Sequence, residues 1–477
     1  MSTAVVWFRR DLRLADNPAL EAAANRHDSL VLLYTDSEPE LGPWAAGAAS
    51  RWWLHHSLDC LDADLGRFGQ ALILKRGTAL QCLRECVAES GAVAVYWNRL
   101  YEPAICQRDT RIKEQLRGDG LAAESFRANL LFEPWEIRTG QDGPFRVFTP
   151  FWRACQRQAA IAQPLPAPTR LPPRPDRTPS SVTVDALGLM PEIRWYDDIA
   201  RMWQPGEHAA HARLADFCDT ALADYADGRD IPSVPGTSRM SPYLHFGEIS
   251  PRSIWHRVGQ HGLLERRQPA AEAFLREIGW REFAHHVLFH YPHTPKQPLN
   301  AKYADFPWRE NHAGLLAAWQ RGQTGFPIVD AGMRELWHTG WMHNRVRMIV
   351  ASLLVKNLRV PWTAGAEWFW DTLVDADLAN NTLGWQWSAG CGADAAPYFR
   401  IFNPVRQGEK FDPDGDYVKR WIPELANLPE RWIHKPWEAP DPLRPGPDAY
   451  PAPVVDLAAS RKEALEALAR LKKRGSG

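Results

Sequence analysis

The sequence lacks several signals that would place it in other protein classes. Its seven cysteines include no C-x-x-C pair, which argues against a disulfide framework and a structural zinc site. No apolar run reaches the roughly 18–20 residues that a membrane span needs. The first residues, MSTAVVWFRRDLRL, carry charge where a signal peptide is apolar. We therefore expect a protein of the reducing cytoplasm with no bound metal and no membrane partner. We also expect a monomer.

The chain also lacks an excess of charge of either sign. Its 56 Lys and Arg residues balance 57 Asp and Glu residues, which gives a net charge of −1. This balance excludes a uniformly basic coat for nucleic acids, but a local basic patch stays open, because net charge does not describe distribution. At about 100–200 residues per domain, the length predicts about two to four domains.

Tryptophan, in contrast, is abundant, with 23 residues. An indole ring is large, and its N–H needs a partner when it is buried. So many tryptophans suggest stacking surfaces or electron-transfer chemistry. A core rich in tryptophan is the alternative.

The first part of the chain alternates short apolar runs with helical patterns such as 50–68 and 78–90. This alternation predicts an α/β domain with a Rossmann-like parallel sheet over residues 1–135. No G-x-G-x-x-G follows the first run, so the fingerprint of nicotinamide dinucleotide binding is absent. The predicted strands are residues 4–8, 30–35, 71–75 and 92–97.

A proline-rich stretch separates this domain from a second one. Residues 161–182 contain seven prolines, which favour an extended chain within an interdomain linker over 136–205. Residues 206–477 have mostly helical patterns and predict an all-α domain. A last amphipathic helix is expected at 456–473, after a second proline-rich stretch at 436–453.

Two polar strings in the helical part suit a bound ligand. Residues 236–242, GTSRMSP, place hydroxyls just before a helical pattern, which suits a phosphate group or simple helix capping. Asp375 and Asp377 lack a third ligand that would complete a metal site. We interpret them as acceptors for the N–H and hydroxyl donors of a ligand.

A predicted helix over residues 270–290 carries a second candidate group. Glu277 and Arg281 are four residues apart, with Trp280 between them on nearly the same face. An ion pair beside a core tryptophan is the simpler interpretation, and a ligand-binding face is the other.

These strings, taken in order, resemble the photolyase/cryptochrome family over nearly the whole chain. The resemblance implies an N-terminal α/β domain that holds an antenna pigment and a helical domain that holds bent FAD. The matching motifs are WFRRDLRLADNPAL, TSRMSPYL, WREF, TGFPIVDAGMREL, GWMHNRVRM, DADLANNTLGWQWSAGCGADAAPYFRIFNP and QGEKFDPDG.

The resemblance also implies which residues hold FAD. One group would lie along the diphosphate and ribose, where hydroxyl and N–H donors suit phosphate oxygens: Tyr225, Thr237, Ser238, Arg239, Met240 and Ser241. A second group would line the flavin ring and the adenine side, with Arg347 nearby: Asn344, Asp375, Asp377 and Asn381.

Within the family, the resemblance favours a class I enzyme that repairs cyclobutane pyrimidine dimers. Asn381 falls where flavin N5 lies, and its amide can donate to a flavin nitrogen without carrying charge. The enzymes for 6-4 photoproducts have two histidines where this chain has Asn344 and Met348. Trp280 and Trp387 match the aromatic walls that hold a flipped-out dimer. The alternative is a blue-light photoreceptor of the cryptochrome type.

The implied reaction is a light-driven electron transfer from reduced FAD to the dimer, whose ring bonds split before the electron returns. Glu277 would hydrogen-bond the dimer and stabilise its negative charge. Trp385, Trp362 and Trp308 resemble the tryptophan chain that keeps the flavin reduced. DNA binding would use a local patch of basic residues. The residues implied at the DNA surface are Arg229, Arg281, Arg345, Arg400 and Arg406.

The antenna pigment is not decided by the sequence. Tyr101 and Glu102 are followed by Pro103, Ala104 and Ile105, so two polar residues of the folate-binding relatives are missing. The local sequence YWNRLYEP is more similar to that of deazaflavin-binding members. Methenyltetrahydrofolate, 8-hydroxy-5-deazaflavin and an empty pocket stay open.

Overall fold

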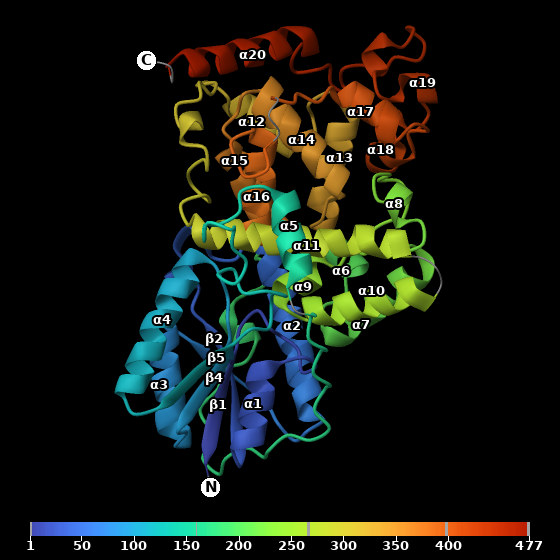
Figure 1. The fold of residues 1–477 in the computed structure, drawn as a ribbon. Helices are drawn as coiled ribbons and strands as arrows, with labels where there is room; N and C mark the ends of the chain where they lie inside the picture. Colours follow the sequence, from blue (N-terminus) through green and yellow to red (C-terminus); the bar gives the residue numbers. More distant parts are fainter. Residues whose placement is uncertain (1, 159, 265–267, 396–398, 475–477) are drawn as a thin grey trace.

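The chain folds into an α/β domain and a helical domain that pack against each other (Figure 1). The structure is a computed structural model, and it describes residues 2–158, 160–264, 268–395 and 399–474. The motif PYFRIF therefore lies partly outside the described residues. Both expected domains are present.

The N-terminal domain is built on a sheet of five parallel strands in the order β3-β2-β1-β4-β5. Four of them confirm the predicted runs. The fifth, the edge strand β5, was not predicted, because its sequence AAESF is short and only partly buried. The bounds are β1 Thr3–Phe8, β2 Ser29–Asp36, β3 Leu72–Arg76, β4 Ala94–Asn98 and β5 Ala122–Phe126.

Helices cover both faces of this sheet. Successive residues of β1 point to opposite sides: Val5 and Trp7 pack toward α3 and α4, while Val6 and Phe8 belong to the core that includes α1 and α2. Both faces of β1 are therefore buried, as expected for a central parallel strand. The bounds are α1 Pro18–Arg26, α2 Ala48–Gly66, α3 Ala79–Ser90 and α4 Pro103–Gly118.

The expected linker over 136–205 has more structure than the sequence predicts. Its proline-rich part is extended and lies along the first domain, where Leu30 N–H donates to Pro173 O at 3.0 Å and Val182 N–H donates to Leu74 O at 3.0 Å. Before it, α5 (Phe148–Arg157) packs on the helical domain. After it come η2 (Asp185–Leu187) and α6 (Asp197–Met202).

The helical domain contains the remaining elements, and its longest helix, α11, runs along the side facing the α/β domain (Figure 1). The final helix confirms the one expected at 456–473. The α-helices are α7 Glu207–Thr220, α8 Tyr225–Gly228, α9 Ser241–Phe246, α10 Pro251–Leu264, α11 Gln268–His290, α12 Ala313–Gln320, α13 Pro327–Thr339, α14 Asn344–Ser352, α15 Trp362–Thr372, α16 Leu378–Ala389, α17 Pro404–Phe411, α18 Asp416–Trp421, α19 Glu430–Ile433 and α20 Leu457–Arg474. Short turns are η3 Ala301–Tyr303, the π-helical η4 Leu353–Asn357, η5 Pro423–Leu425 and η6 Pro436–Glu438.

The two domains meet backbone to backbone at two glycines. A Cβ at Gly47 would lie 2.3 Å from Trp370 O, and one at Gly247, where φ is 67°, would lie 2.2 Å from Arg10 O. Neither position accepts a side chain, so the contact requires glycine. Among the described residues, no helix is both long and apolar enough to cross a membrane.

Candidate functional site

The segment between α8 and α9 forms a tight loop at the proposed diphosphate position. A Cβ at Gly236 would lie 2.5 Å from Gly228 O, so the two ends of the loop touch through their backbones. Arg239 has a left-handed φ of 54°, a conformation that costs about 1–3 kcal/mol and is common at ligand sites. Ser238 Oγ accepts from Met240 N–H at 3.4 Å.

The Arg239 guanidinium has no carboxylate within ion-pair distance among the residues that the structure describes. It lies 4.9 Å from the centroid of the Trp341 ring and 3.6 Å from the Met202 sulfur. Its burial lowers its pKa from the usual value. A half-buried cation without a counter-ion fits an anionic ligand such as a diphosphate. The nearby residues lie as follows: Tyr225, Ser238 and Met240 are buried, Thr237 is half-buried, and Ser241 is exposed at the start of α9.

Asp375 and Asp377 have different partners. Asp375 forms a two-oxygen ion pair with Arg347 Nη2, at 2.8 and 3.0 Å. Asp377 caps α16, since its Oδ1 accepts from Asn380 N–H at 2.8 Å. Its Oδ2 lies 3.5 Å from His285 Nε2. The imidazoles of His285 and His245 help to hold the pKa of Asp377 well below its usual range against the opposing effect of burial.

The two asparagines expected at the flavin differ in hydrogen bonding and exposure. Asn381 Nδ2 donates to Ala366 O at 3.0 Å, so one of its two N–H donors is engaged. The sequence predicts the amide as a donor to a ligand, and the residues that the structure describes leave the second N–H and the oxygen for that purpose. Asn344 is exposed at the first position of α14.

Glu277 pairs with a residue that the sequence did not suggest. Its Oε1 accepts from Arg229 Nη1 at 2.7 Å, and both side chains are about 30% exposed (30% and 26%). The expected pair with Arg281 is wrong. Arg281 instead donates to Asn129 O at 2.6 Å and is 11% exposed. This contact joins it to the α/β domain, and its expected place at the DNA surface stays a prediction.

A second ion pair links α14 to the same loop. Asp230, the residue after Arg229, accepts from Arg345 Nη2 at 2.8 Å. The other Arg345 nitrogen, Nη1, lies 3.8 Å from the Met348 sulfur. Two consecutive residues therefore connect Glu277 on α11 with Met348 on α14.

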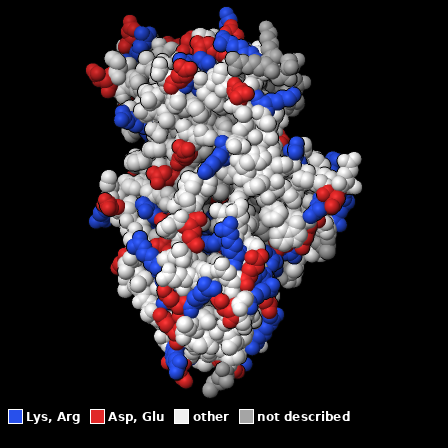
Figure 2. All heavy atoms as spheres, turned by 90° about the vertical axis from the view of Figure 1, so that its left-hand side faces the viewer, with Lys and Arg blue, Asp and Glu red and all other residues white. Residues whose placement is uncertain are grey.

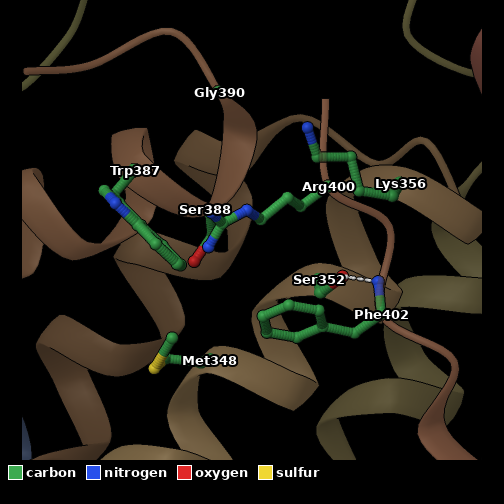
Figure 3. Close-up of a pocket in the computed structure, with 8 residues that line it drawn as sticks. All are labelled: Met348, Ser352, Lys356, Trp387, Ser388, Gly390, Arg400 and Phe402. Atoms are coloured by element: carbon green, nitrogen blue, oxygen red, sulfur yellow. Dashed lines mark hydrogen bonds between the residues drawn. The ribbon is translucent and has the colours of Figure 1, made fainter. Parts of the chain in front are cut away.

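Met348 and Trp387, expected at the substrate, line one small cavity together with Arg400 (Figure 3). The cavity volume is about 20 Å³, which is room for about one water molecule. The Arg400 side chain extends across it toward Ser388 and Trp387 (Figure 3). On α11, Trp280 stacks on Phe148 of α5, with centroids 3.8 Å apart.

The three tryptophans of the expected electron route lie in or against one core cluster. Trp385 is 2% exposed, Trp362 is 5% exposed, and Trp308 is half-buried. The Trp385 ring packs against Gly365, where a Cβ would lie 2.1 Å from it. Its Nε1 has no hydrogen-bond partner among the described residues. The exposure rises along the expected order, from the interior toward the surface.

The charged surface is mixed. On the face drawn in Figure 2, basic and acidic side chains are interspersed over the α/β domain, in keeping with the net charge of −1. Arg400 and Arg406 are exposed, and neither has an ion pair with a described residue. They are free to meet phosphates.

A larger cavity lies between the two domains, at the carboxyl ends of the parallel strands. Its volume is about 560 Å³, which is in the range of small-ligand pockets. Buried polar atoms without a partner among the described residues point to a ligand there: Arg9 Nε, Glu38 Oε1 and Glu102 Oε2. Burial raises the pKa of Glu38 and of Asp36. The helical domain contributes His245, Trp370 and Leu378 to the walls.

These features define a two-domain protein in which a helical domain has a polar cofactor site and a parallel α/β domain borders a second ligand cavity. Residues 4–170 match the family described as DNA photolyase, and residues 274–470 match the FAD binding domain of DNA photolyase. The chain belongs to the photolyase/cryptochrome family, and its helical domain is the FAD-binding domain of that family.

Relatives of both functional kinds are similar to the chain. A deoxyribodipyrimidine photo-lyase of Agrobacterium fabrum is 47% identical over 98% of each chain. Cryptochrome-1 of Arabidopsis thaliana is 40% identical over 98% of this chain and 70% of its own length. A bacterial class III photolyase from Agrobacterium tumefaciens superposes with a TM-score of 0.95 at 46% identity, over 99% of this chain and 98% of that chain. The class I subclass expected from the sequence therefore stays a prediction.

Sequence reasoning missed several residues of the site. Asp230 and Phe148 became visible only through their contacts with Arg345 and Trp280. Lys356 also lines the small cavity. A lysine within the apolar stretch 353–358 (LLVKNL) was the one available signal, because lysine is rarely buried without a partner.

Proposed function

We propose that the protein repairs cyclobutane pyrimidine dimers in DNA by a light-driven, carbon–carbon bond-splitting reaction. When bound, reduced FAD supplies the electron that splits the dimer. The observation that supports this most directly is the linked group Glu277, Arg229, Asp230, Arg345 and Met348. It brings an acceptor carboxylate and an apolar thioether from two helices to one loop.

The side chains have distinct tasks in this proposal. Trp280 and Trp387 are the flat faces on which a flipped-out dimer stacks, a contact worth about 1–3 kcal/mol per base. Glu277 accepts from the thymine imide N–H, and its pair with Arg229 fixes the carboxylate. Arg345, Arg400 and Arg406 bind the phosphates on either side of the lesion. Met348 fills the apolar part of the pocket, where a histidine would favour another photoproduct.

The charged and polar side chains of the cofactor site suit the chemical groups of FAD. The unpaired Arg239 and the loop donors around it hold the diphosphate. The ion pair of Arg347 with Asp375 fixes a carboxylate beside the flavin ring, and Asn381 presents an uncharged amide to it. Trp385, Trp362 and Trp308 pass electrons inward to reduce the cofactor.

The large interdomain cavity holds a second, light-collecting pigment in this proposal. Its volume of about 560 Å³ and its unpaired polar atoms suit a conjugated heterocycle with hydrogen-bonding edges. Methenyltetrahydrofolate and 8-hydroxy-5-deazaflavin both have this chemistry. The pigment released by heat denaturation, identified by its absorption spectrum and mass, distinguishes them.

A cryptochrome-type photoreceptor is the second candidate, supported by the 40% identity to Cryptochrome-1 of Arabidopsis thaliana. The test uses FAD-loaded, chemically reduced protein and an oligonucleotide with one thymine dimer. Recovery of thymine absorbance under blue light, absent in the dark, would support repair. A yellow protein that photoreduces but restores no thymine would support the photoreceptor.

A further inference from the structure

Lys356 is a buried cation at the small cavity beside Trp387 and Arg400. Its side chain projects from η4, and the residue is 1% exposed. It lines the same cavity as Met348, Trp387 and Arg400 (Figure 3). Nothing in the proposed repair chemistry uses it so far.

The partners of Lys356 are all uncharged. Nζ donates to Ala389 O at 2.8 Å, at the C-terminal end of α16, and lies over the Phe399 ring. The helix end favours a cation. Among the described residues, no carboxylate lies within ion-pair distance of Nζ.

The groups on the surrounding elements do not supply a negative charge either. Burial raises the pKa of Cys391 to about 12, so its thiol stays neutral. The Tyr303 hydroxyl, whose pKa burial also raises, lies on η3. Glu463 of α20, which packs on η4, pairs instead with Arg309 and Arg359. Arg400 adds a second positive charge to the cavity.

An ammonium buried without a counter-ion is unfavourable, because its desolvation is not offset. Burial accordingly lowers the pKa of Lys356 to about 7. The cavity has two cationic side chains, no described acid and room for about one water. This arrangement fits an anion-binding site.

We propose that Lys356 is a further lesion-binding residue, whose counter-charge is a DNA phosphodiester next to the dimer. The phosphate meets Arg400 directly and Lys356 through one water in the cavity. This inference rests on the proposed function, because it requires that dimer-containing DNA occupies the Met348–Trp387 cavity.

The proposal has a thermodynamic consequence that a purely structural lysine lacks. A phosphate beside Lys356 favours its charged form, so the pKa of Lys356 rises on binding. Near pH 7.5, the free protein has Lys356 partly neutral and the complex has it protonated. Binding of dimer-containing DNA must therefore take up a substantial fraction of one proton.

Calorimetry in the dark measures this uptake. FAD-loaded protein is titrated at pH 7.5 with a duplex that carries one thymine dimer, in buffers of different ionisation enthalpy. The slope of the binding heat against ionisation enthalpy is the number of protons exchanged. We expect clear uptake with the wild type, little with Lys356→Met, and dimer binding without uptake with Lys356→Arg, since arginine is always protonated. Lys462→Met, an exposed lysine of α20, is the matched control and should keep the uptake.

The outcomes separate the inference from the proposed function. Equal proton uptake by the wild type and Lys356→Met, or none by the wild type, overturns the role of Lys356 while dimer binding itself stays intact. A wild type that does not prefer dimer-containing DNA overturns both. Where Lys356→Met loses FAD or does not fold, Lys356→Arg decides alone, because proton uptake that persists in this variant contradicts the proposal.

Discussion

Arg229 and Asp230 are neighbours in the chain, yet their side chains join different helices. Arg229 donates to Glu277 of α11 at 2.7 Å, and Asp230 accepts from Arg345 of α14 at 2.8 Å. One short connection after α8 therefore orients two charged groups at the proposed lesion site. A substitution at either partner tests whether that orientation matters for repair.

Replacing Glu277 with alanine should weaken recognition of the dimer and leave FAD bound. The variant would lose a charge-assisted hydrogen bond to the dimer, worth about 1.5–3 kcal/mol. Its affinity for dimer-containing DNA should therefore fall by about 10- to 100-fold, and the repair yield should fall with it. Dimer binding and thymine recovery are measured on reduced protein. Glu430→Ala, an exposed glutamate, is the control. A yield equal to that of the wild type would remove Glu277 from the mechanism.

Replacing Trp385 with phenylalanine should stop photoreduction of oxidised FAD. Phenylalanine keeps an aromatic ring at this position but lacks the outer indole atoms that contact Gly365, and a benzene ring is much harder to oxidise than an indole. Repair by chemically pre-reduced protein should continue. The measurement is the loss of flavin absorbance under blue light with an external reductant, and Trp97→Phe, in the sheet of the other domain, is the comparison. Normal photoreduction in Trp385→Phe would show that the electron enters elsewhere.

Arg400→Gln should weaken binding to DNA with and without a dimer and reduce its dependence on salt. Each lost phosphate contact lowers the slope of log K against log salt by about 0.9 for duplex DNA. Arg461→Gln, on the exposed side of α20, should leave the slope unchanged. Binding isotherms at several salt concentrations give both slopes, and identical values for the two variants would place Arg400 outside the DNA surface.

Glu248 should make the stability of the protein depend on pH. It is fully buried between α2 and α7, where it accepts from Trp53 Nε1 at 3.1 Å and from Gly206 N–H at 2.6 Å. Burial raises its pKa to about 8 from an ordinary value of 4.5. The folded state thus binds a proton that the unfolded state has released, and the free energy of unfolding falls as the pH rises from about 4.5 to 8.

The variant Glu248→Gln, which cannot ionise, should lose this part of the pH dependence. Urea unfolding at pH 5.5 and pH 8 gives the difference in free energy for each protein, at about 1.4 kcal/mol per unit of pKa shift. Glu430→Gln is again the exposed control. A wild type whose stability does not fall relative to Glu248→Gln over this range would mean that Glu248 is ionised in the fold.

The local sequence predicted the elements that have a regular apolar pattern. It failed where contacts between residues distant in the sequence determine the structure. The apolar run at 4–8 predicted a strand, and α20 follows from its Leu and Ala spacing. The spacing of Glu277 and Arg281 gave the wrong pair, because α11 packs with Arg281 against the α/β domain. The stack of Trp280 on Phe148 joins segments that the sequence does not relate.

The glycine contacts at 47 and 247 bear on how light energy would reach the helical domain. Transfer of excitation between two pigments depends on their separation and on the angle between their transition dipoles. The interdomain cavity has walls from both domains, and main chain touches main chain at two of its lining residues, Trp370 and Arg10. The relative position of two chromophores would thus be fixed by the backbone. Substitutions inside the cavity could change which pigment is held, or its colour, without altering the optical geometry of the pair.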